Sequence, residues 1–474
     1  MLMRITIIFC MLLPMVLQAQ QQLWTLEQCV ARAEEKNLIV LNSALDLELA
    51  DKNRERALWD LAPDLNGVAS HGYNYGRVVD RFTNTFANDR VRTNNFFLSS
   101  NLTLFEGMRK QQTLRQSRID VDAATQGMEA SRNDVRLEVV QAFLDVLGLR
   151  ERMRATEQQI ANTEEQLRLT DALVEAGRIA RAELLALDAQ LAQEQFTLTD
   201  LQNQHDLRML GLGRSMQLEP RQMLTFDIAA PVISDLRVVE PNAAPEEVLD
   251  NVLRTNPAYI QAELQVQSAE RAVTIARAGT LPSLSLQGSL GTGYSGRNFR
   301  QVGEPVIDGT VPIGFTDSGE TVYSPNFSVN TALVPFGEQL DENFNQSLSF
   351  TLQVPLFNQM NNRFRIDQAR VAQERSRNTM ISVRNDMQRA VLDAIVMQRS
   401  AYRQFHAATR AVEAGELAQE YAEARFQQGA ITAVELNTAK NNLNQATADL
   451  INAKYQYLMA TKYLDILQGI PLTL

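Results

Sequence analysis

The residues with the clearest potential for chemistry in this chain are the glycines of Gly291-Thr292-Gly293-Tyr294-Ser295-Gly296. Their spacing matches the G-x-G-x-x-G fingerprint of dinucleotide-binding proteins, in which the backbone approaches a pyrophosphate at a helix N-terminus. Here the motif runs into Arg297-Asn298-Phe299 and a long segment rich in Gly, Pro and Asp, with no helical pattern after it. It therefore predicts flexible glycines at a strand end rather than a nucleotide site.

Other residue types that catalyse reactions or bind metals are scattered along the sequence. The three histidines, His71, His205 and His406, stand apart from cysteines and clustered carboxylates, so none has metal-ligand spacing. The sequence has no G-x-x-x-x-G-K-[ST] loop, which argues against ATP hydrolysis, and no carboxylate pair stands out as catalytic. We expect no catalytic, cofactor-binding or metal-binding residues and no enzyme activity.

The chain contains an internal duplication: the same order of helical and strand patterns occurs twice. Asn256 and Pro282 lie 219 residues after Asn37 and Pro63. Further along, the offset is 252 residues, and it relates three pairs: Phe105 and Phe357, Gly177 and Gly429, Glu183 and Glu435. The 33-residue difference falls in the loop between two strands, as expected where packed elements keep their length and surface loops change.

Bulk properties narrow the class of protein. Residues 1–19 resemble a secretory signal, with Arg4, an apolar run from Ile5 to Leu17, and Ala19 at the expected cleavage point. That run is too short to cross about 30 Å of hydrocarbon as a helix. Only Cys29 lies beyond the signal, which predicts no intramolecular disulfide. A net charge of −11 with interleaved acids and bases argues against nucleic acid as a partner.

Four segments alternate between apolar and small polar residues and predict strands, at about 64–76, 95–105, 283–294 and 344–357. One apolar face and one uncharged polar face suit lipid outside and water inside, although a soluble sandwich explains any single segment equally well. Four strands cannot close a barrel, so closure requires several copies: two would give eight strands and three would give twelve. We expect residues 77–94 and about 295–343 to be exposed loops on the far side of the membrane from the helices.

Helical patterns fill most of the remaining chain. The stretches of about 108–176 and 361–428 contain no proline and predict helices of roughly 100 Å at about 1.5 Å per residue. Shorter helices are expected over four further ranges: about 26–61, 180–210, 246–279 and 432–467. Helices this polar need neighbours along their length, which predicts a helical tube. An elongated coiled coil explains the helices equally well but leaves the strands and the signal unexplained.

Prolines and glycines mark the connections. Pro63 and Pro282 are expected where a helix passes into a strand, and Pro355 where a strand precedes a long helix. Gly177 and Gly429 separate two helices each, and glycine permits the left-handed backbone of a tight helix reversal.

These residues resemble the outer-membrane efflux protein family, the TolC-like channels. Four motifs in the same order carry the resemblance, in addition to the doubled layout: Leu281-Pro282-Ser283-Leu284, Val354-Pro355-Leu356-Phe357 with its partner Leu102-Thr103-Leu104-Phe105, Glu175-Ala176-Gly177 with Ala182-Glu183-Leu184, and Gln428-Gly429-Ala430 with Val434-Glu435-Leu436. The resemblance implies a mainly α protein with β-strands. Long antiparallel helices would form a periplasmic α-barrel, and four strands per protomer would complete a 12-stranded outer-membrane β-barrel in a homotrimer.

The signal and the duplication, together with the family's equatorial domain, set the expected domain boundaries. They are a signal peptide at 1–19, a first repeat at 20–212, a linker or equatorial segment at 213–245, a second repeat at 246–467, and a C-terminal tail at 468–474.

Candidate site residues follow from the resemblance. Family members close the periplasmic end with acidic rings six and nine residues after the second tip glycine. Here those positions are Glu435 and Thr438, so only the first ring is matched. The arginine that some members carry two residues after the glycine is Ile431 here, so the latch must differ. The turns at Gly177-Arg178 and Gly429-Ala430 are the candidate adaptor-docking tips.

The function implied is a passive exit duct in the cell outer membrane that extends into the periplasm. It would serve a tripartite efflux pump or a type I secretion system. Its expected partners are a periplasmic adaptor protein, an inner-membrane RND or ABC transporter, and outer-membrane lipid. A non-conducting exported coiled-coil scaffold is the alternative. Drugs, metal ions, bile-like detergents and secreted proteins all remain open as cargo.

Overall fold

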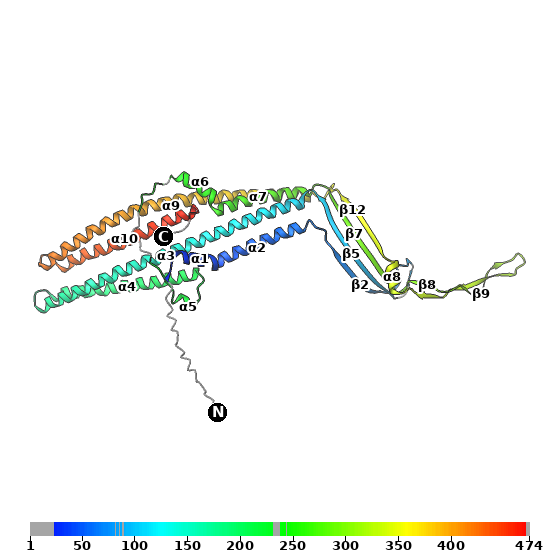
Figure 1. Ribbon diagram of the computed structural model, residues 1–474, viewed down its shortest axis with the longest axis horizontal. Coiled ribbons are helices and arrows are strands. Elements are labelled where there is room, and N and C mark those ends of the chain that lie inside the picture. The colour runs from blue at the N-terminus through cyan, green and yellow to red at the C-terminus, as the bar shows by residue number, and fades with distance from the viewer. Residues whose placement is uncertain are drawn as a thin grey trace, which may run out of the picture. The chain divides into compact units, whose positions relative to one another are not determined.

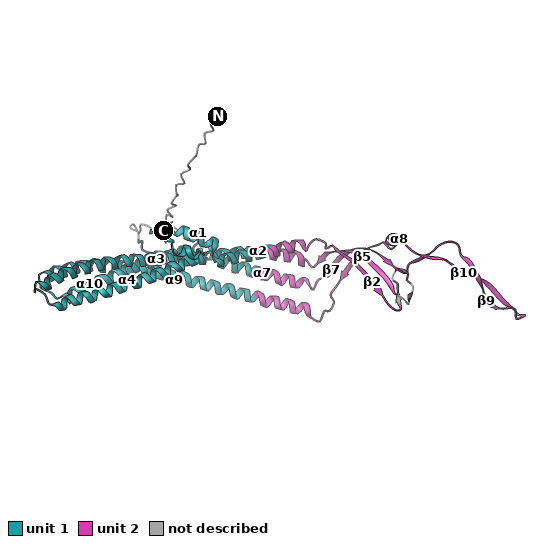
Figure 2. Ribbon diagram, turned by 90° about the horizontal axis from the view of Figure 1, so that it is seen from below, with its two compact units in different colours: residues 1–51, 119–267, 374–474 teal, residues 52–118, 268–373 magenta. Residues whose placement is uncertain are grey.

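The computed structural model describes residues 23–470 except 81, 85, 88–89, 231–237 and 243. The predicted signal at 1–19 and the residues from 471 onward lie outside the described part. The chain divides into two compact units (Figure 2). One comprises residues up to 51, 119–267 and from 374 onward, and the other comprises 52–118 and 268–373. All four boundaries between the units fall inside helices.

The helices of the two halves match in length, element by element (Figure 1). The first half contains α1 (Leu26–Lys36), α2 (Leu38–Trp59), α3 (Arg109–Glu175) and α4 (Arg181–Ser215). The second half contains α6 (Pro245–Thr255), α7 (Pro257–Ala278), α9 (Asn361–Gln427) and α10 (Ala433–Leu467). Corresponding helices have 11, 22, 67 and 35 residues in both halves. The sequence offsets are therefore those of a structural duplication.

Single helices expected over 26–61 and 246–279 are each interrupted once. The backbone is extended at Asn37 and at Asn256, which end α1 and α6. Each asparagine then begins the next helix, because its side-chain Oδ1 accepts a hydrogen bond from the backbone two residues on, at 2.9 Å from Ile39 and 3.0 Å from Ala258. The interruptions are thus capped helix ends.

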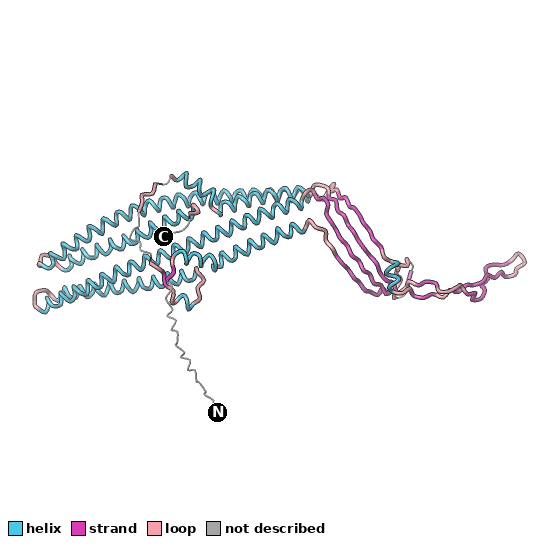
Figure 3. The backbone as a smooth tube through the Cα atoms, in the orientation of Figure 1, coloured by secondary structure: helices cyan, strands magenta, loops and turns pink. Residues whose placement is uncertain are grey.

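Four antiparallel strands form one sheet in the order β12-β7-β5-β2 (Figure 3). They are β2 (Asn66–Asn74), β5 (Val91–Glu106), β7 (Ser283–Ser295) and β12 (Asn345–Gln353). The register places Leu98, Leu290 and Leu102 on one face, with Leu286, Phe350 and Leu352 beside them. Ser99, Ser289, Ser285, Ser347 and Thr351 lie on the other face. The alternation seen in the sequence therefore becomes one apolar and one polar face.

The two β-hairpins share a register as well as a pattern. Val68 on β2 is opposite Phe97 on β5, and their counterparts at the two offsets, Gln287 and Ser349, are opposite each other on β7 and β12. The duplication thus extends to individual cross-strand pairs.

The segment expected as an irregular loop over 295–343 contains ordered elements. A hairpin of β9 (Val306–Phe315) and β10 (Thr321–Ser328) is followed by helix α8 (Phe336–Glu342). Short strands β8 (Phe299–Gln301) and β11 (Thr331–Leu333) pair with each other, as do β3 (Val78–Val79) and β4 (Phe86–Ala87) in the other loop. Pro312 and Pro325 obscured this hairpin in the sequence, because proline cannot donate to a strand ladder.

The segment 213–245, expected as a linker or equatorial segment, contains short ordered elements. Helix α4 reaches Ser215, a four-residue helix α5 (Pro220–Met223) follows, and β6 (Asp227–Ile228) pairs in parallel with β1 (Leu23–Trp24). The Arg150 guanidinium on α3 donates to the Ile228 carbonyl at 2.8 Å and forms an ion pair with Asp227. These bonds tie the linker to the long helix.

The helical unit has two cores that repeat each other. One core contains five fully buried residues: Cys29, Ala33, Val139, Phe143 and Leu212. At the same two offsets, the other core contains five buried residues: Val248, Val252, Val391, Ile395 and Leu464. Burial of these apolar faces stabilises helices whose own sequences are polar.

Candidate functional site

The reversals between long helices are built on left-handed glycines. Gly177 has φ +67° and Gly429 has φ +69°. In each turn the next residue donates its backbone N–H five residues back, Arg178 to Leu173 and Ala430 to Arg425, both at 2.9 Å. This is the Schellman arrangement that ends a helix. A side chain at either glycine would meet no atom within 4 Å, and Arg178 and Ala430 are exposed. Both tips therefore present exposed turns with the same backbone geometry.

The helices that leave the two tips are capped differently. At the start of α10 the Thr432 hydroxyl accepts from the Glu435 N–H at 3.3 Å, and the Glu435 carboxylate accepts from the Thr432 N–H at 2.9 Å. This reciprocal capping box stabilises the first turn. At the start of α4 the cap is Ala180, which has no side-chain bond, although Glu183 occupies the place of Glu435.

The candidate gate residues lie within the first turns of α10. Glu435 and Thr438 are both exposed in the single chain. The Thr438 hydroxyl donates to the Val434 carbonyl at 2.8 Å, and the Glu435 carboxylate is held by its cap. Each side chain thus bonds within its own helix, and its carboxylate or hydroxyl remains accessible to solvent.

The helical unit also contains a buried polar layer around Glu194 and Lys440 that was not predicted from the sequence. Glu194 on α4 is 6% exposed, and its Oε1 accepts from Gln159 at 2.6 Å, from Gln190 at 2.8 Å and from Thr163 at 3.2 Å. Lys440 on α10 is also buried, donates to Gln166 on α3 and lies 3.8 Å from the Glu423 carboxylate. Burial lowers the pKa of Lys440 below its ordinary value of 10.5, and the nearby carboxylates of Glu423 and Glu194 oppose that shift.

The signal for this layer was present in the sequence. Glu194 lies seven residues after Leu187 and seven before Leu201, and both leucines are buried. A heptad position that holds a charge between two leucines predicts a buried polar group. Such layers commonly fix the register of neighbouring helices rather than add stability.

Three predicted prolines lie at or beside the junctions between helix and strand. Pro63 follows the end of α2, Pro282 precedes β7, and Pro355 follows β12. The connections from a strand back to a long helix contain two consecutive residues in the left-handed conformation. These are Gly107-Met108 before α3 and Gln359-Met360 before α9. A side chain at Gly107 would lie 2.8 Å from the Ala278 carbonyl, so glycine is required there by close packing.

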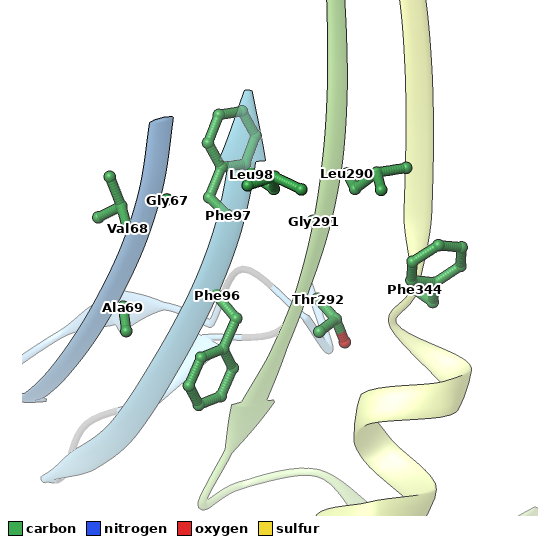
Figure 4. Close-up of a pocket in the computed structure, with 10 residues that line it drawn as sticks. All are labelled: Gly67, Val68, Ala69, Phe96, Phe97, Leu98, Leu290, Gly291, Thr292 and Phe344. Atoms are coloured by element: carbon green, nitrogen blue, oxygen red, sulfur yellow. The ribbon is translucent and has the colours of Figure 1, made fainter. Parts of the chain in front are cut away.

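The sheet is the second candidate site. A shallow pocket spans β2, β5 and β7 and reaches Phe344, just before β12 (Figure 4). Apart from Thr292, it is lined by apolar residues and glycines. The polar face carries hydroxyl and amide groups at successive levels, among them Ser289 and Ser347, whose hydroxyl oxygens are 2.7 Å apart. No helix among the described residues is long and apolar enough to cross a membrane. The described residues also contain no group of three or more His, Cys, Asp or Glu side chains suited to hold a metal ion.

Comparison with known proteins decides the family. The family model described as outer membrane efflux protein matches residues 29–216 and 248–469. The chain belongs to this family. The two matched segments correspond to the two halves of the duplication. Membership in the outer membrane efflux protein family places the chain in the outer membrane, with an extension into the periplasm.

Two curated relatives are pyoverdine export outer membrane proteins named OpmQ. The one from Pseudomonas aeruginosa is 31% identical over 156 residues, which cover 33% of this chain and 31% of the relative. The one from Pseudomonas putida is 29% identical over 181 residues, or 37% of each chain. The chain thus matches about a third of the length of these relatives.

Two solved structures of outer-membrane proteins share the fold. VceC from Vibrio cholerae superposes with a TM-score of 0.75 at 14% identity, covering 94% of this chain and 97% of that one. The Campylobacter jejuni CmeC outer membrane channel superposes with a TM-score of 0.74 at 16% identity, covering 94% and 85%. The predicted fold class of long helices with a small set of strands is confirmed.

Proposed function

We propose that the protein is a homotrimeric outer-membrane channel and serves as the passive exit duct of a tripartite efflux pump or type I secretion system. The observation that carries this proposal is the two-faced sheet. Its outer strands β2 and β12 each pair on one side only within the described chain. One face is mainly apolar, and the other is lined mainly by Ser, Thr, Asn and Gln.

Unpaired strand edges are not tolerated in hydrocarbon, so the edges of this sheet must meet those of other copies. Three copies give twelve strands with the apolar face toward lipid and the polar face around water. Two copies would give eight strands, whose interior side chains fill the barrel. The trimer is therefore the assembly that supports transport.

The hairpin tips are the proposed docking site for a periplasmic adaptor, which would connect the duct to an inner-membrane RND or ABC transporter. Their support is local: Gly177-Arg178 and Gly429-Ala430 are exposed reversals held by Schellman bonds at the ends of 67-residue helices. A rigid scaffold that presents an exposed turn is a natural contact surface.

The proposed gate is a ring of three Glu435 side chains beside three Thr438 side chains. A ring of carboxylates attracts cations and repels anions. The curated relatives are named for export of pyoverdine, which makes a small organic molecule the first cargo class to test.

The proposal is tested by extracting the protein from membranes and measuring its conductance. Membranes that contain the protein are subjected to osmotic shock and then to detergent, and the extracted species is reconstituted in planar bilayers. A detergent-dependent trimer that conducts supports the duct. Release by osmotic shock of a species that never inserts would favour an exported scaffold instead.

A further inference from the structure

The polar face of the sheet carries one exposed apolar pair, Val68 on β2 and Phe97 on β5 (Figure 4). The two are cross-strand partners and are 58% and 43% exposed. Val91, the first residue of β5, is the other apolar residue of this face among the paired positions, but it is covered, with 1% exposed. The remaining paired positions of this face in the four strands hold Ser, Thr, Asn, Gln or Gly, with Glu106 at one end.

The duplication supplies an internal comparison for this pair. The equivalent cross-strand partners in the second half are Gln287 and Ser349, which are both polar. The same register and the same face therefore accept a polar pair. The apolar character of Val68 and Phe97 is a property of this level of the sheet, not a demand of the strand geometry.

The Phe97 side chain also leans across the sheet. A Cβ placed on Gly291 of β7 would be 3.4 Å from Phe97 Cδ2, so the ring borders the bare backbone of that glycine. An aromatic ring beside a glycine stabilises a sheet and also leaves a flat apolar surface open to a ligand. Part of the Phe97 ring is still exposed to water, so a ligand that covers it would bind more tightly through burial of apolar surface.

We propose that Val68 and Phe97 form a contact site for the aromatic or apolar part of amphipathic organic cargo as it passes the barrel. The site rests on the proposed function, because it faces a lumen only when copies of the sheet close. In a trimer the pair occurs three times at one level of a lumen otherwise lined by hydroxyl and amide groups. Ions and hydrophilic solutes would pass this level without binding.

The test measures block of single-channel current by tetraphenylphosphonium, an aromatic cation, with tetramethylammonium as a hydrophilic cation of equal charge. The double variant Val68→Gln/Phe97→Ser gives the first half the pair that the second half already holds. It should raise the apparent dissociation constant for tetraphenylphosphonium roughly three- to tenfold, the range expected for loss of an aromatic contact. Current carried by tetramethylammonium should not change.

The reverse variant Gln287→Val/Ser349→Phe builds a second apolar pair and should strengthen tetraphenylphosphonium block. It covers the case in which the first variant does not assemble. Unchanged block in a variant that conducts normally would overturn the inference and leave the duct intact. Absence of conductance in the unmodified trimer would instead overturn the proposed function, and the inference with it.

Discussion

Asn37 and Asn256, 219 residues apart, hold the same place in two copies of one helix break. Each N–H donates to a carbonyl four residues back at 2.8 Å, and each side chain caps the helix that follows. They differ in one bond: Asn37 Nδ2 also donates to the buried Ser215 carbonyl at 3.0 Å. The first copy is thus tied to the end of α4 by a side chain whose counterpart, among the described residues, makes only the capping bond.

Replacing these asparagines with serine separates the two roles. Serine caps helices about as well as asparagine but is too short to reach Ser215. Asn256→Ser should change the free energy of unfolding by under about 0.5 kcal/mol, whereas Asn37→Ser should lower it by about 1–3 kcal/mol. Chemical denaturation followed by helical circular dichroism measures both. Equal losses would show that the Ser215 bond contributes nothing.

The tip glycines are required for their backbone angle rather than for space. Because φ is near +67° and the surroundings are open, Gly177→Ala should cost about 1–2 kcal/mol of stability. Gly211 lies inside α4 with open space around it, and Gly211→Ala should stabilise the protein by about 0.5–1 kcal/mol. The two variants, compared by thermal melting, should shift the midpoint in opposite directions.

Docking at the tips predicts a separate effect on transport. Gly177→Val and Gly429→Val should abolish efflux in cells while trimers still assemble, because the altered turn no longer fits an adaptor. Efflux is measured as accumulation of a fluorescent substrate, and adaptor recruitment by co-purification. Normal efflux with normal recruitment would show that the tips are not the dock.

Lys440 should make stability depend on alkaline pH. Its pKa is lowered in the folded protein, so the unfolded chain binds more protons above that pKa. The free energy of unfolding should therefore gain a contribution that rises with pH between the lowered pKa and about 10.5. Lys440→Met should remove this rise, and Lys52→Met, at an exposed lysine, is the matched control. A rise that persists in Lys440→Met would assign it to another group.

Cys29 should be inert in the native protein. It is fully buried, and burial, with a smaller contribution from Glu27, raises the pKa of the thiol to about 12. Since the thiolate is the nucleophile, N-ethylmaleimide at neutral pH should label the native protein more than about 100-fold more slowly than the denatured chain. Mass spectrometry over time measures both rates. Rapid native labelling would mean that α1 opens readily.

Glu435 and Glu183 offer a matched pair for the gate. They occupy the same place in the two halves, but only Glu435 is assigned to the proposed constriction. Glu435→Ala should weaken cation selectivity and block by multivalent cations, while Glu183→Ala should leave both unchanged. Loss of the Glu435 cap should cost no more than about 1 kcal/mol of stability. Unchanged reversal potentials in Glu435→Ala would remove this residue from the gate.

The large features of the fold could be predicted from the sequence because they depend on repetition and periodicity. The offsets of 219 and 252 residues predicted paired elements, and alternation predicted a sheet with two faces. Most local features, such as helix caps and buried polar groups, could not be predicted. A capping asparagine looks like any polar residue in a helix, and Lys440 looks like a surface charge until its neighbours show that it is buried. Glu194 is the exception, because its heptad spacing between Leu187 and Leu201 indicates burial. The β9–β10 hairpin was hidden because prolines weaken a strand signal.

The central claim is that copies of this chain close around a water-filled pore. Single-channel current from the detergent-purified protein in a planar lipid bilayer tests it most directly. We predict a trimer that inserts into the bilayer and gives discrete, small, cation-selective openings. A protein that stays monomeric and never inserts would contradict it.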